Sequence, residues 1–150
     1  MTQIQQQPIV SAPGGGDRLN IAGSEILHRA NSGETDGVFS VVELVNDPGT
    51  GVSLHVHEHE DELAYVLDGE IEVTLGDDKM KAVPGVLALL PRDIPHGFTN
   101  TGAKPSRILD VIMPGRFDQY FVDMHNLYLN GEPAQDKADE LARKYGIRYL

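Results

Sequence analysis

The chain of 150 residues contains no cysteine and no tryptophan, and it carries few basic side chains. Without cysteine it can form neither disulfides nor thiolate metal sites, so a metal ion would have to be held by imidazole and carboxylate groups. Twelve Lys and Arg residues against 23 Asp and Glu residues leave a formal net charge of -11. This negative charge disfavours binding to nucleic-acid phosphates and anionic lipids. We therefore expect neither a nucleic-acid partner nor a membrane partner.

Long apolar segments are also missing. No run approaches the roughly 20 apolar residues that span a bilayer, and the N-terminal stretch MTQIQQQPIV lacks the basic start and apolar centre of a signal peptide. These features predict a soluble, cytoplasmic protein. With 40% hydrophobic residues, the chain is long enough to bury one core and too short for two comfortable domains.

The residue pattern changes twice along the chain. Residues 1–18 are rich in Gln, Pro and Gly and are expected to form a flexible N-terminal arm. Residues 19–114 contain short apolar or alternating runs between turn residues, which predicts an all-β barrel, and Asp68-Gly69 predicts a tight hairpin within it. Residues 115–150 show helical spacing, which predicts two helices on the outside of the barrel, with Gly131 and Gly146 as stops. The apolar positions of these helices are Phe117, Tyr120, Phe121, Met124 and Leu127, then Ala134, Ala138, Leu141, Ala142 and Tyr145.

Residues 53–70, SLHVHEHEDELAYVLDGE, contain three histidines and a run of acidic residues. His55 and His57 are two positions apart in an extended segment, so both side chains leave the same face of a sheet. Glu62 follows an acidic turn at the start of the next strand, where it can fold back beside them. His96 lies further on, in the short strand of PRDIPHGFTN. If the barrel closes, three imidazoles and one carboxylate can meet inside and bind a divalent metal.

Other side chains near these residues have simpler interpretations. The remaining acidic residues of the turn are interpreted as a solvated surface: Glu58, Glu60 and Asp61. His59 falls in the same turn and is expected to be exposed, with a role as a substitute ligand as the alternative. The isolated His28 and His125 are interpreted as surface or packed residues. Phe98 shares the inward face of His96, which leaves core packing and a substrate-pocket wall as two open roles.

Two motifs in the chain resemble the two-motif signature of the cupin superfamily. The spacing G-x5-H-x-H-x4-E-x6-G is met by Gly49, His55, His57, Glu62 and Gly69. The spacing G-x5-P-x-G-x2-H-x3-N is met by Gly85, Pro91, His96 and Asn100, with Asp93 in place of the third expected residue. Aspartate tolerates left-handed turn conformations, so we expect the turn at Asp93 to survive.

The resemblance covers residues 38–114 closely and carries several implications. It implies a single jelly-roll barrel in which His55, His57, Glu62 and His96 bind one metal ion. Glu62 is preferred to Asp61, because Asp61 would break the six-residue gap to Gly69. The family also implies a homodimer, which exposed strand edges and two amphipathic helices favour on physical grounds.

Three imidazoles and one carboxylate leave a divalent ion with net positive charge and with open positions. This favours Fe, Mn, Ni, Co or Cu acting on a bound oxygen donor over a closed structural zinc site. The sequence does not identify the metal, and Zn remains a candidate. The segments DELAYVLDGEIEV and PRDIPHGFTN and the ending KADELARKYGIRYL resemble bacterial quercetin 2,3-dioxygenase-like monocupins. That narrower resemblance implies dioxygenolytic opening of a flavonol ring with release of carbon monoxide, and Glu62 as the catalytic base.

Two other functions remain open for a small-molecule substrate. One is a metal-dependent isomerase, epimerase or decarboxylase of a sugar or small acid. Such substrates usually require cationic side chains, and few lie near the motifs: Arg92, Lys104, Arg107 and Arg116. The other is a barrel without catalytic activity that binds a small metabolite through its metal.

Overall fold

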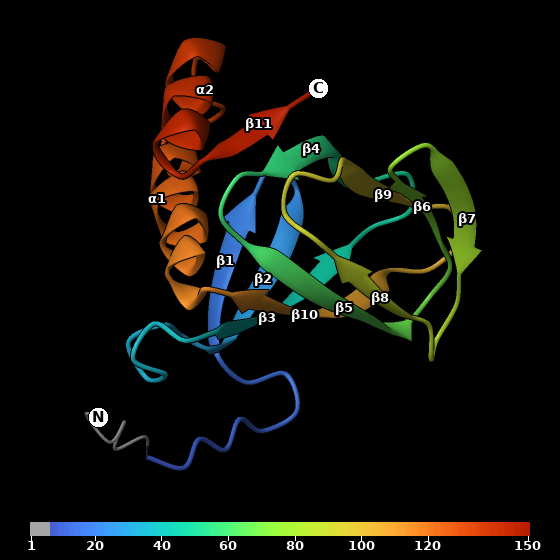
Figure 1. The fold of residues 1–150 in the computed structure, drawn as a ribbon, viewed down its shortest axis with the longest axis horizontal. Helices are drawn as coiled ribbons and strands as arrows, with labels where there is room; N and C mark the ends of the chain where they lie inside the picture. Colours follow the sequence, from blue (N-terminus) through green and yellow to red (C-terminus); the bar gives the residue numbers. More distant parts are fainter. Residues whose placement is uncertain (1–6) are drawn as a thin grey trace.

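The structure, a computed structural model, describes residues 7–150. Its strands form two sheets that enclose a barrel, with two helices at one end (Figure 1). In order of pairing, the first sheet contains β1 (Asp17–Ile21), β2 (Ser24–Ala30), β3 (Ser40–Asn46), β10 (Ser106–Met113), β5 (Asp61–Asp68) and β8 (Leu87–Leu90). The second contains β11 (Ile147–Tyr149), β4 (Gly51–His57), β9 (His96–Asn100), β6 (Ile71–Leu75) and β7 (Asp78–Ala82). The prediction of a small all-β barrel with C-terminal helices is confirmed.

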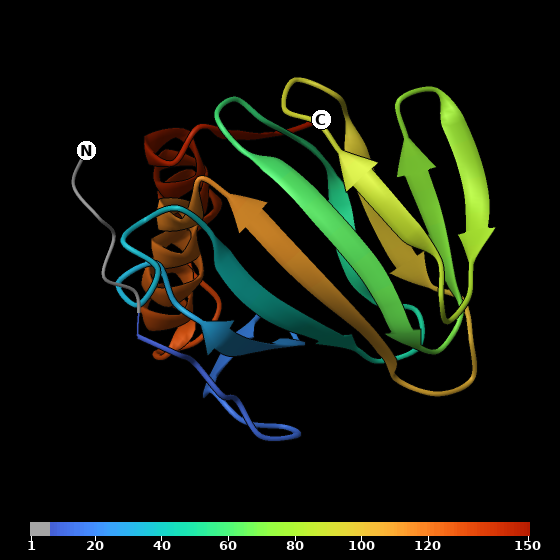
Figure 2. The same cartoon turned by 60° about the horizontal axis from the view of Figure 1, so that its bottom comes forward.

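Strand β10 shows how the sequence pattern builds the barrel. Its buried positions Ile108, Asp110 and Ile112 alternate with the less buried Leu109 and Val111. Because side chains on a strand alternate between faces, the first three point inward and the other two point to the outer face. β10 lies between β3 and β5, and Figure 2 shows β5 and β10 running side by side. The inward face of β10 therefore lies across from the second sheet.

The prediction of a hairpin at Asp68-Gly69 is wrong. β5 pairs with β10 and β8, whereas β6 pairs with β7 and β9, so this turn carries the chain from one sheet to the other. Gly69 has a φ of +90°, and a Cβ atom there would lie 2.8 Å from the Cα of Ser106. The glycine thus satisfies a positive φ and a close backbone approach. The residues of a tight turn are visible in the sequence. Which strands pair with one another depends instead on which sheet each strand joins.

The two predicted helices are present as α1 (Asp118–Tyr128) and α2 (Gln135–Lys144), after a 3-10 turn at Gly115–Phe117. They lie together beside β1 (Figure 1). Their buried side chains join those of the neighbouring strands in one cluster: Leu19, Ile26, Val42, Ile112, Phe117, Tyr120, Met124, Ala142 and Ile147. Burial of each large apolar side chain contributes roughly 1.5–3 kcal/mol, which attaches the helices to the barrel. Neither these helices nor any other in the described residues is long and apolar enough to cross a membrane.

A second apolar cluster fills the end of the barrel away from the helices. It contains Val66, Ile71, Ala82 and Ile108, which come from β5, β6, β7 and β10. Phe98 on β9 packs against it. Both sheets therefore contribute to the closure of this end.

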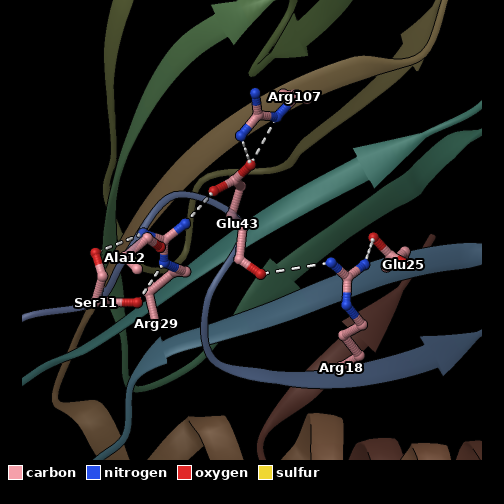
Figure 3. A network of polar contacts seen from close by, with 8 residues as sticks. Ser11, Ala12, Arg18, Glu25, Arg29, Glu43 and Arg107 are labelled. Carbon is pink, nitrogen blue, oxygen red and sulfur yellow. Dashed lines mark hydrogen bonds and ion pairs between the residues drawn. The ribbon is translucent and has the colours of Figure 1, made fainter.

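The N-terminal segment is attached to the outer face of the first sheet by the side chain of Arg29 (Figure 3). The Arg29 guanidinium donates to Ser11 Oγ at 2.8 Å and to the carbonyl of Ala12 at 2.8 Å. It also pairs with the buried carboxylate of Glu43 at 2.9 Å, and Arg107 contacts the same carboxylate from the other side.

Residues 1–6 of the predicted arm lie outside the described residues. The division into 1–18, 19–114 and 115–150 stays a prediction.

Candidate metal centre

Four side chains from three strands converge inside the barrel. β4 carries His55 and His57, and Glu62 and His96 lie at the starts of β5 and β9. One ligand atom from each residue lies within 4.8 Å of the others, and all four residues are buried. The structure therefore brings together the three imidazoles and the carboxylate that the sequence singled out.

Strand pairing explains this convergence. His55 lies opposite His96 on the neighbouring strand, and their ring centroids are 4.4 Å apart. His57 follows two positions later on the same face of β4, and its Nε2 lies 3.2 Å from Glu62 Oε1. The second carboxylate oxygen of Glu62, Oε2, lies 3.0 Å from His96 Nε2. Glu62 thus reaches two imidazoles of the opposite sheet.

Each of the three imidazoles has an outer acceptor beside its Nδ1 atom. The Nδ1 of His55 donates to the carbonyl of Ser53 at 2.7 Å, and the Nδ1 of His96 donates to the carbonyl of Ile94 at 3.1 Å. The Nδ1 of His57 instead lies 3.4 Å from a carboxylate oxygen of Glu60, which is a charge contact without good hydrogen-bond alignment. Outer partners of this kind hold metal-ligating histidines in place and leave Nε2 to face the ion.

Burial and mutual charge shift the pKa values of the cluster residues in different directions. Burial and the charges of His96 and His57 lower the pKa of His55 to about 4. Burial also acts to lower the pKa of His57, but contacts with Glu60 and Glu62 outweigh it and raise the pKa to about 9. Burial acts to raise the pKa of Glu62, but hydrogen bonds with His57 and His96 hold it well below its usual range. Glu62 is therefore an anion, and a divalent cation would replace the protons it shares with the imidazoles.

The acidic turn differs from its sequence interpretation at Glu60. This residue is only 8% exposed because it folds back against the end of β4 and contacts His57, so its assignment to a solvated surface is wrong. Asp61, the rival carboxylate, forms an ion pair with Arg92 at 2.9 Å on the outside of the cluster. The side chain of His59 is 67% exposed and lies near Glu58.

The two isolated histidines lie outside the cluster. His28 is buried, and its Nε2 lies 2.9 Å from Asp118 Oδ2. Asp118 is also bound by the backbone N–H and hydroxyl of Ser32, so this group fixes the start of α1 against β2. The Nδ1 of His125 contacts the backbone of Asn20 on β1. Both histidines therefore connect α1 to the barrel.

The remaining signature positions support the backbone around the cluster. Asp93 adopts a φ of +64°, as its tolerance of the left-handed region allows, and its N–H donates to the carbonyl of His57 at 2.8 Å. The buried side chain of Asn100 donates to the carbonyls of Asn46 and Lys104 and accepts from the N–H of Gly102. Asn100 thus ties three chain segments together without facing the metal-ligand atoms.

A cavity of about 530 Å³ includes the four cluster residues in its wall. Most of its other lining residues are apolar, and several are aromatic, including Phe98, Phe117 and Tyr120. No Lys or Arg side chain lines it within residues 7–150. Phe98 both borders this cavity and packs on the second apolar cluster. Its role in substrate binding stays a prediction.

Two polar residues in the cavity wall were not singled out from the sequence. Tyr149 on β11 lies opposite His55, with ring centroids 5.7 Å apart, and its hydroxyl is 3.0 Å from that of Tyr120. The three-residue strand IRY is too short to show a pattern. Asp110 is buried on β10 and also lines the cavity. A sequence signal for Asp110 existed, since it is a charge at an inward position of the alternating run SRILDVIMP.

Comparisons with known proteins agree with this geometry. The family model of the cupin domain matches residues 42–112, which include all four cluster residues. Among curated proteins, quercetin 2,3-dioxygenase of Bacillus subtilis is 25% identical over 93% of this chain. The chain spans 41% of that relative's length.

Solved structures show the same fold. The structure of TT1209 from Thermus thermophilus is 30% identical and has a TM-score of 0.58, with 65% of this chain and 90% of that chain covered. The structure of KdgF from Halomonas sp. is 26% identical and has a TM-score of 0.62, with 69% of this chain and 92% of that chain covered. In both cases most of the solved chain is matched by about two thirds of this one.

Proposed function

Because the chain belongs to the cupin superfamily, we propose that its His55, His57, Glu62 and His96 cluster holds one divalent transition metal. The ion is Fe, Mn, Ni, Co, Cu or Zn, and the donor set does not distinguish these. The supporting observation is the orientation of the imidazoles, whose Nδ1 atoms face outer acceptors while the ligand atoms converge on a carboxylate. When bound, the ion supplies a Lewis acid for an oxygen donor of the substrate.

We propose that the protein is a metal-dependent dioxygenase that acts on a flavonol-like or other small oxygen-donor aromatic substrate. The apolar cavity with aromatic side chains beside the cluster supports this choice. Phosphorylated or carboxylated substrates normally need cationic partners, and no Lys or Arg lines the cavity in the described chain. Arg92 and Arg107 are instead paired with Asp61 and Glu43. The lack of cationic side chains in the described cavity wall weighs against an isomerase or decarboxylase of a sugar phosphate or small acid.

Glu62 is the residue that would accept the proton of a substrate hydroxyl. Its carboxylate contacts two imidazoles, which hold its pKa well below the usual range and so keep its proton affinity low. Release of the carboxylate from these contacts would raise that affinity as the proton arrives, so no second base is needed. We expect Glu62→Gln to keep the fold and to lower the rate of substrate turnover about a hundredfold or more, the scale for loss of a general base. The measurement is turnover per bound metal ion. A variant that turns over at the wild-type rate with full metal content would contradict this role.

The substrate proposal is tested by addition of quercetin to metal-loaded protein without oxygen. We expect the flavonol absorption to shift on binding and to bleach only when oxygen enters. A non-catalytic binding protein would show the shift without the bleaching, and an enzyme for sugars or small acids would show neither. Either result would contradict the proposed activity and leave the metal centre in place.

We also propose that the chain forms a homodimer through the outer face of the first sheet. Exposed apolar side chains gather there on two adjacent strands, with Tyr65 and Leu67 on β5 and Leu87 and Leu89 on β8. Tyr65 lies directly opposite Leu87, so the side chains form one continuous patch. β8 is the edge of its sheet, and a second copy would bring an identical patch related by a two-fold axis.

A further inference from the structure

Asp110 occupies an unusual position for a carboxyl group. It lies in the middle of β10, and its side chain points into the barrel between those of Ile108 and Ile112. Its direct neighbours across the sheet are Val42 on β3 and Ala64 on β5, and both are apolar. Asp110 is 6% exposed, and it lines the same cavity as the metal-centre residues. A carboxyl group has thus been placed among apolar side chains.

One carboxyl oxygen of Asp110 lacks a partner in the part of the chain that the structure describes. Its Oδ1 is buried and has no hydrogen-bond partner among residues 7–150. No Lys or Arg lines the cavity in that range, so an internal ion pair does not account for it. Buried polar atoms are nearly always hydrogen-bonded, and exceptions need an external partner or a functional reason. The atom therefore points to a ligand or to water in the cavity.

The register places Asp110 close to the metal centre. Ile112 lies opposite Glu62, and Asp110, two positions earlier on the same face of β10, lies opposite Ala64. Asp110 is therefore a diagonal neighbour of Glu62 on the inner wall of the barrel. Its unpaired Oδ1 is able to accept a hydrogen bond from a hydroxyl group in the cavity.

We propose that Asp110 binds a hydroxyl group of the substrate while another oxygen of the same molecule reaches the metal centre. This inference rests on the proposed function and narrows the substrate class. The ligand is a largely apolar aromatic molecule with at least two oxygen groups, one for the metal centre and one for Asp110. The side chain thus sets the orientation of the substrate in a cavity that is otherwise mostly apolar.

The test compares three variants as metal-loaded proteins. Asp110→Leu removes both oxygens with little change in size, and Asp110→Asn keeps an acceptor and a donor. Ser40→Ala is the matched control, because Ser40 Oγ is also buried without a hydrogen-bond partner in the described residues but does not line the cavity. Metal content, thermal unfolding and the dissociation constant of quercetin without oxygen are measured for each.

We expect Asp110→Leu to bind quercetin about tenfold to a hundredfold more weakly than wild type, the scale of one hydrogen bond to a buried carboxyl group. Asp110→Asn and Ser40→Ala should stay within about threefold of wild type. Metal content should not change. The unfolding temperature of Asp110→Leu should not fall, because replacing an unpaired buried polar group by an apolar one is neutral or stabilising.

Two results would overturn this inference and leave the proposed function intact. One is unchanged quercetin affinity in metal-loaded Asp110→Leu, and the other is a large loss of stability in this variant, which would show a structural role. A wild-type protein that takes up no metal or binds no quercetin would overturn the proposed function and this inference with it. The wild-type measurement therefore separates the two failures.

Discussion

At the residue scale, the proposed metal centre depends on the nitrogen that each histidine turns toward the barrel interior. Ser53 on β4 and Ile94 in the turn before β9 accept from the Nδ1 atoms of His55 and His96 through backbone carbonyls, which no side-chain substitution removes. His57 relies on the side chain of Glu60 instead. The orientation of His57 is therefore the one that a side-chain substitution can change.

The neighbouring His57 and His59 provide a matched pair of substitutions. We expect His57→Ala to lower metal affinity by about tenfold or more, because it removes one of four ligands. Loss of an outer partner of a ligand is already on the order of tenfold. His59→Ala should bind metal like wild type, because its side chain is 67% exposed and lies outside the cluster. Metal titration monitored by competition with a chelating dye measures both. Equal losses in the two variants would show that the turn has a different register.

Residue-level prediction from the sequence succeeded where strand periodicity was sufficient. His55 and His57 share an inward face because side chains alternate along a strand, and this parity is visible in the sequence. His96 lies on a different strand, and the second motif of the family signature was needed to place it beside them. The burial of Glu60 was not predictable, because a turn residue has no such periodicity and its burial depends on how the turn folds over β4. The environment of Asp110 depends on β3 and β5 together, which are far from β10 in the sequence.

At the element scale, a buried carboxylate between two guanidinium groups connects neighbouring strands on the outer face of the first sheet. Glu43 on β3 connects Arg29 on β2 with Arg107 on β10, and Arg29 also holds the N-terminal segment through Ser11 and Ala12 (Figure 3). One anion thus links three adjacent strands and the segment that precedes them.

We expect Glu43→Ala to lower the free energy of unfolding by roughly 2–4 kcal/mol, because it leaves two charged groups without their partner. This loss lies toward the lower end of what breaking a buried ion pair costs, because the side chain of Arg107 is 44% exposed. Glu25→Ala is the control, because Glu25 forms an exposed pair with Arg18 and should contribute at most about 1 kcal/mol. Urea unfolding measures both variants. Similar losses in the two would contradict the importance of burial here.

The sequence predicted most elements but not all of their connections. The helices were recognisable because Phe117, Tyr120 and Met124 recur at helical spacing and meet the barrel core. The turn at Gly69 was recognisable, but its role as a corner between sheets was not, since partner choice is decided by burial of each strand in the finished barrel. β11 escaped recognition because its pairing with β4 is long-range and its length is three residues.

At the scale of the whole molecule, the apolar patch on β5 and β8 predicts self-association. We expect the wild type to elute as a dimer in size-exclusion chromatography with light scattering, and Leu89→Lys to shift it toward a monomer, because a charge would have to be buried in the interface. Leu129→Lys is the control, since Leu129 is similarly exposed but lies at the end of α1. A monomeric wild type would contradict the dimer. A dimer disrupted only by the control would place the interface on the helices.

The proposed metal ion makes a further prediction for the molecule as a whole. A ligand that binds only the folded state stabilises it according to its concentration relative to its dissociation constant. The ion would join β4, β5 and β9 and so connect the two sheets. Removal of the metal by a chelator should therefore lower the unfolding temperature, and this shift should be absent in His96→Ala.

The central claim is that the four buried ligands hold a divalent metal ion, and the most direct measurement is the metal content of protein purified without a histidine tag. Elemental analysis should find about one divalent transition-metal ion per chain, either as purified or after reloading of chelated protein, as expected for one four-ligand site. His96→Ala analysed in parallel should contain little. A wild-type protein that is folded, free of metal and unable to be reloaded with any of the candidate ions would contradict the account.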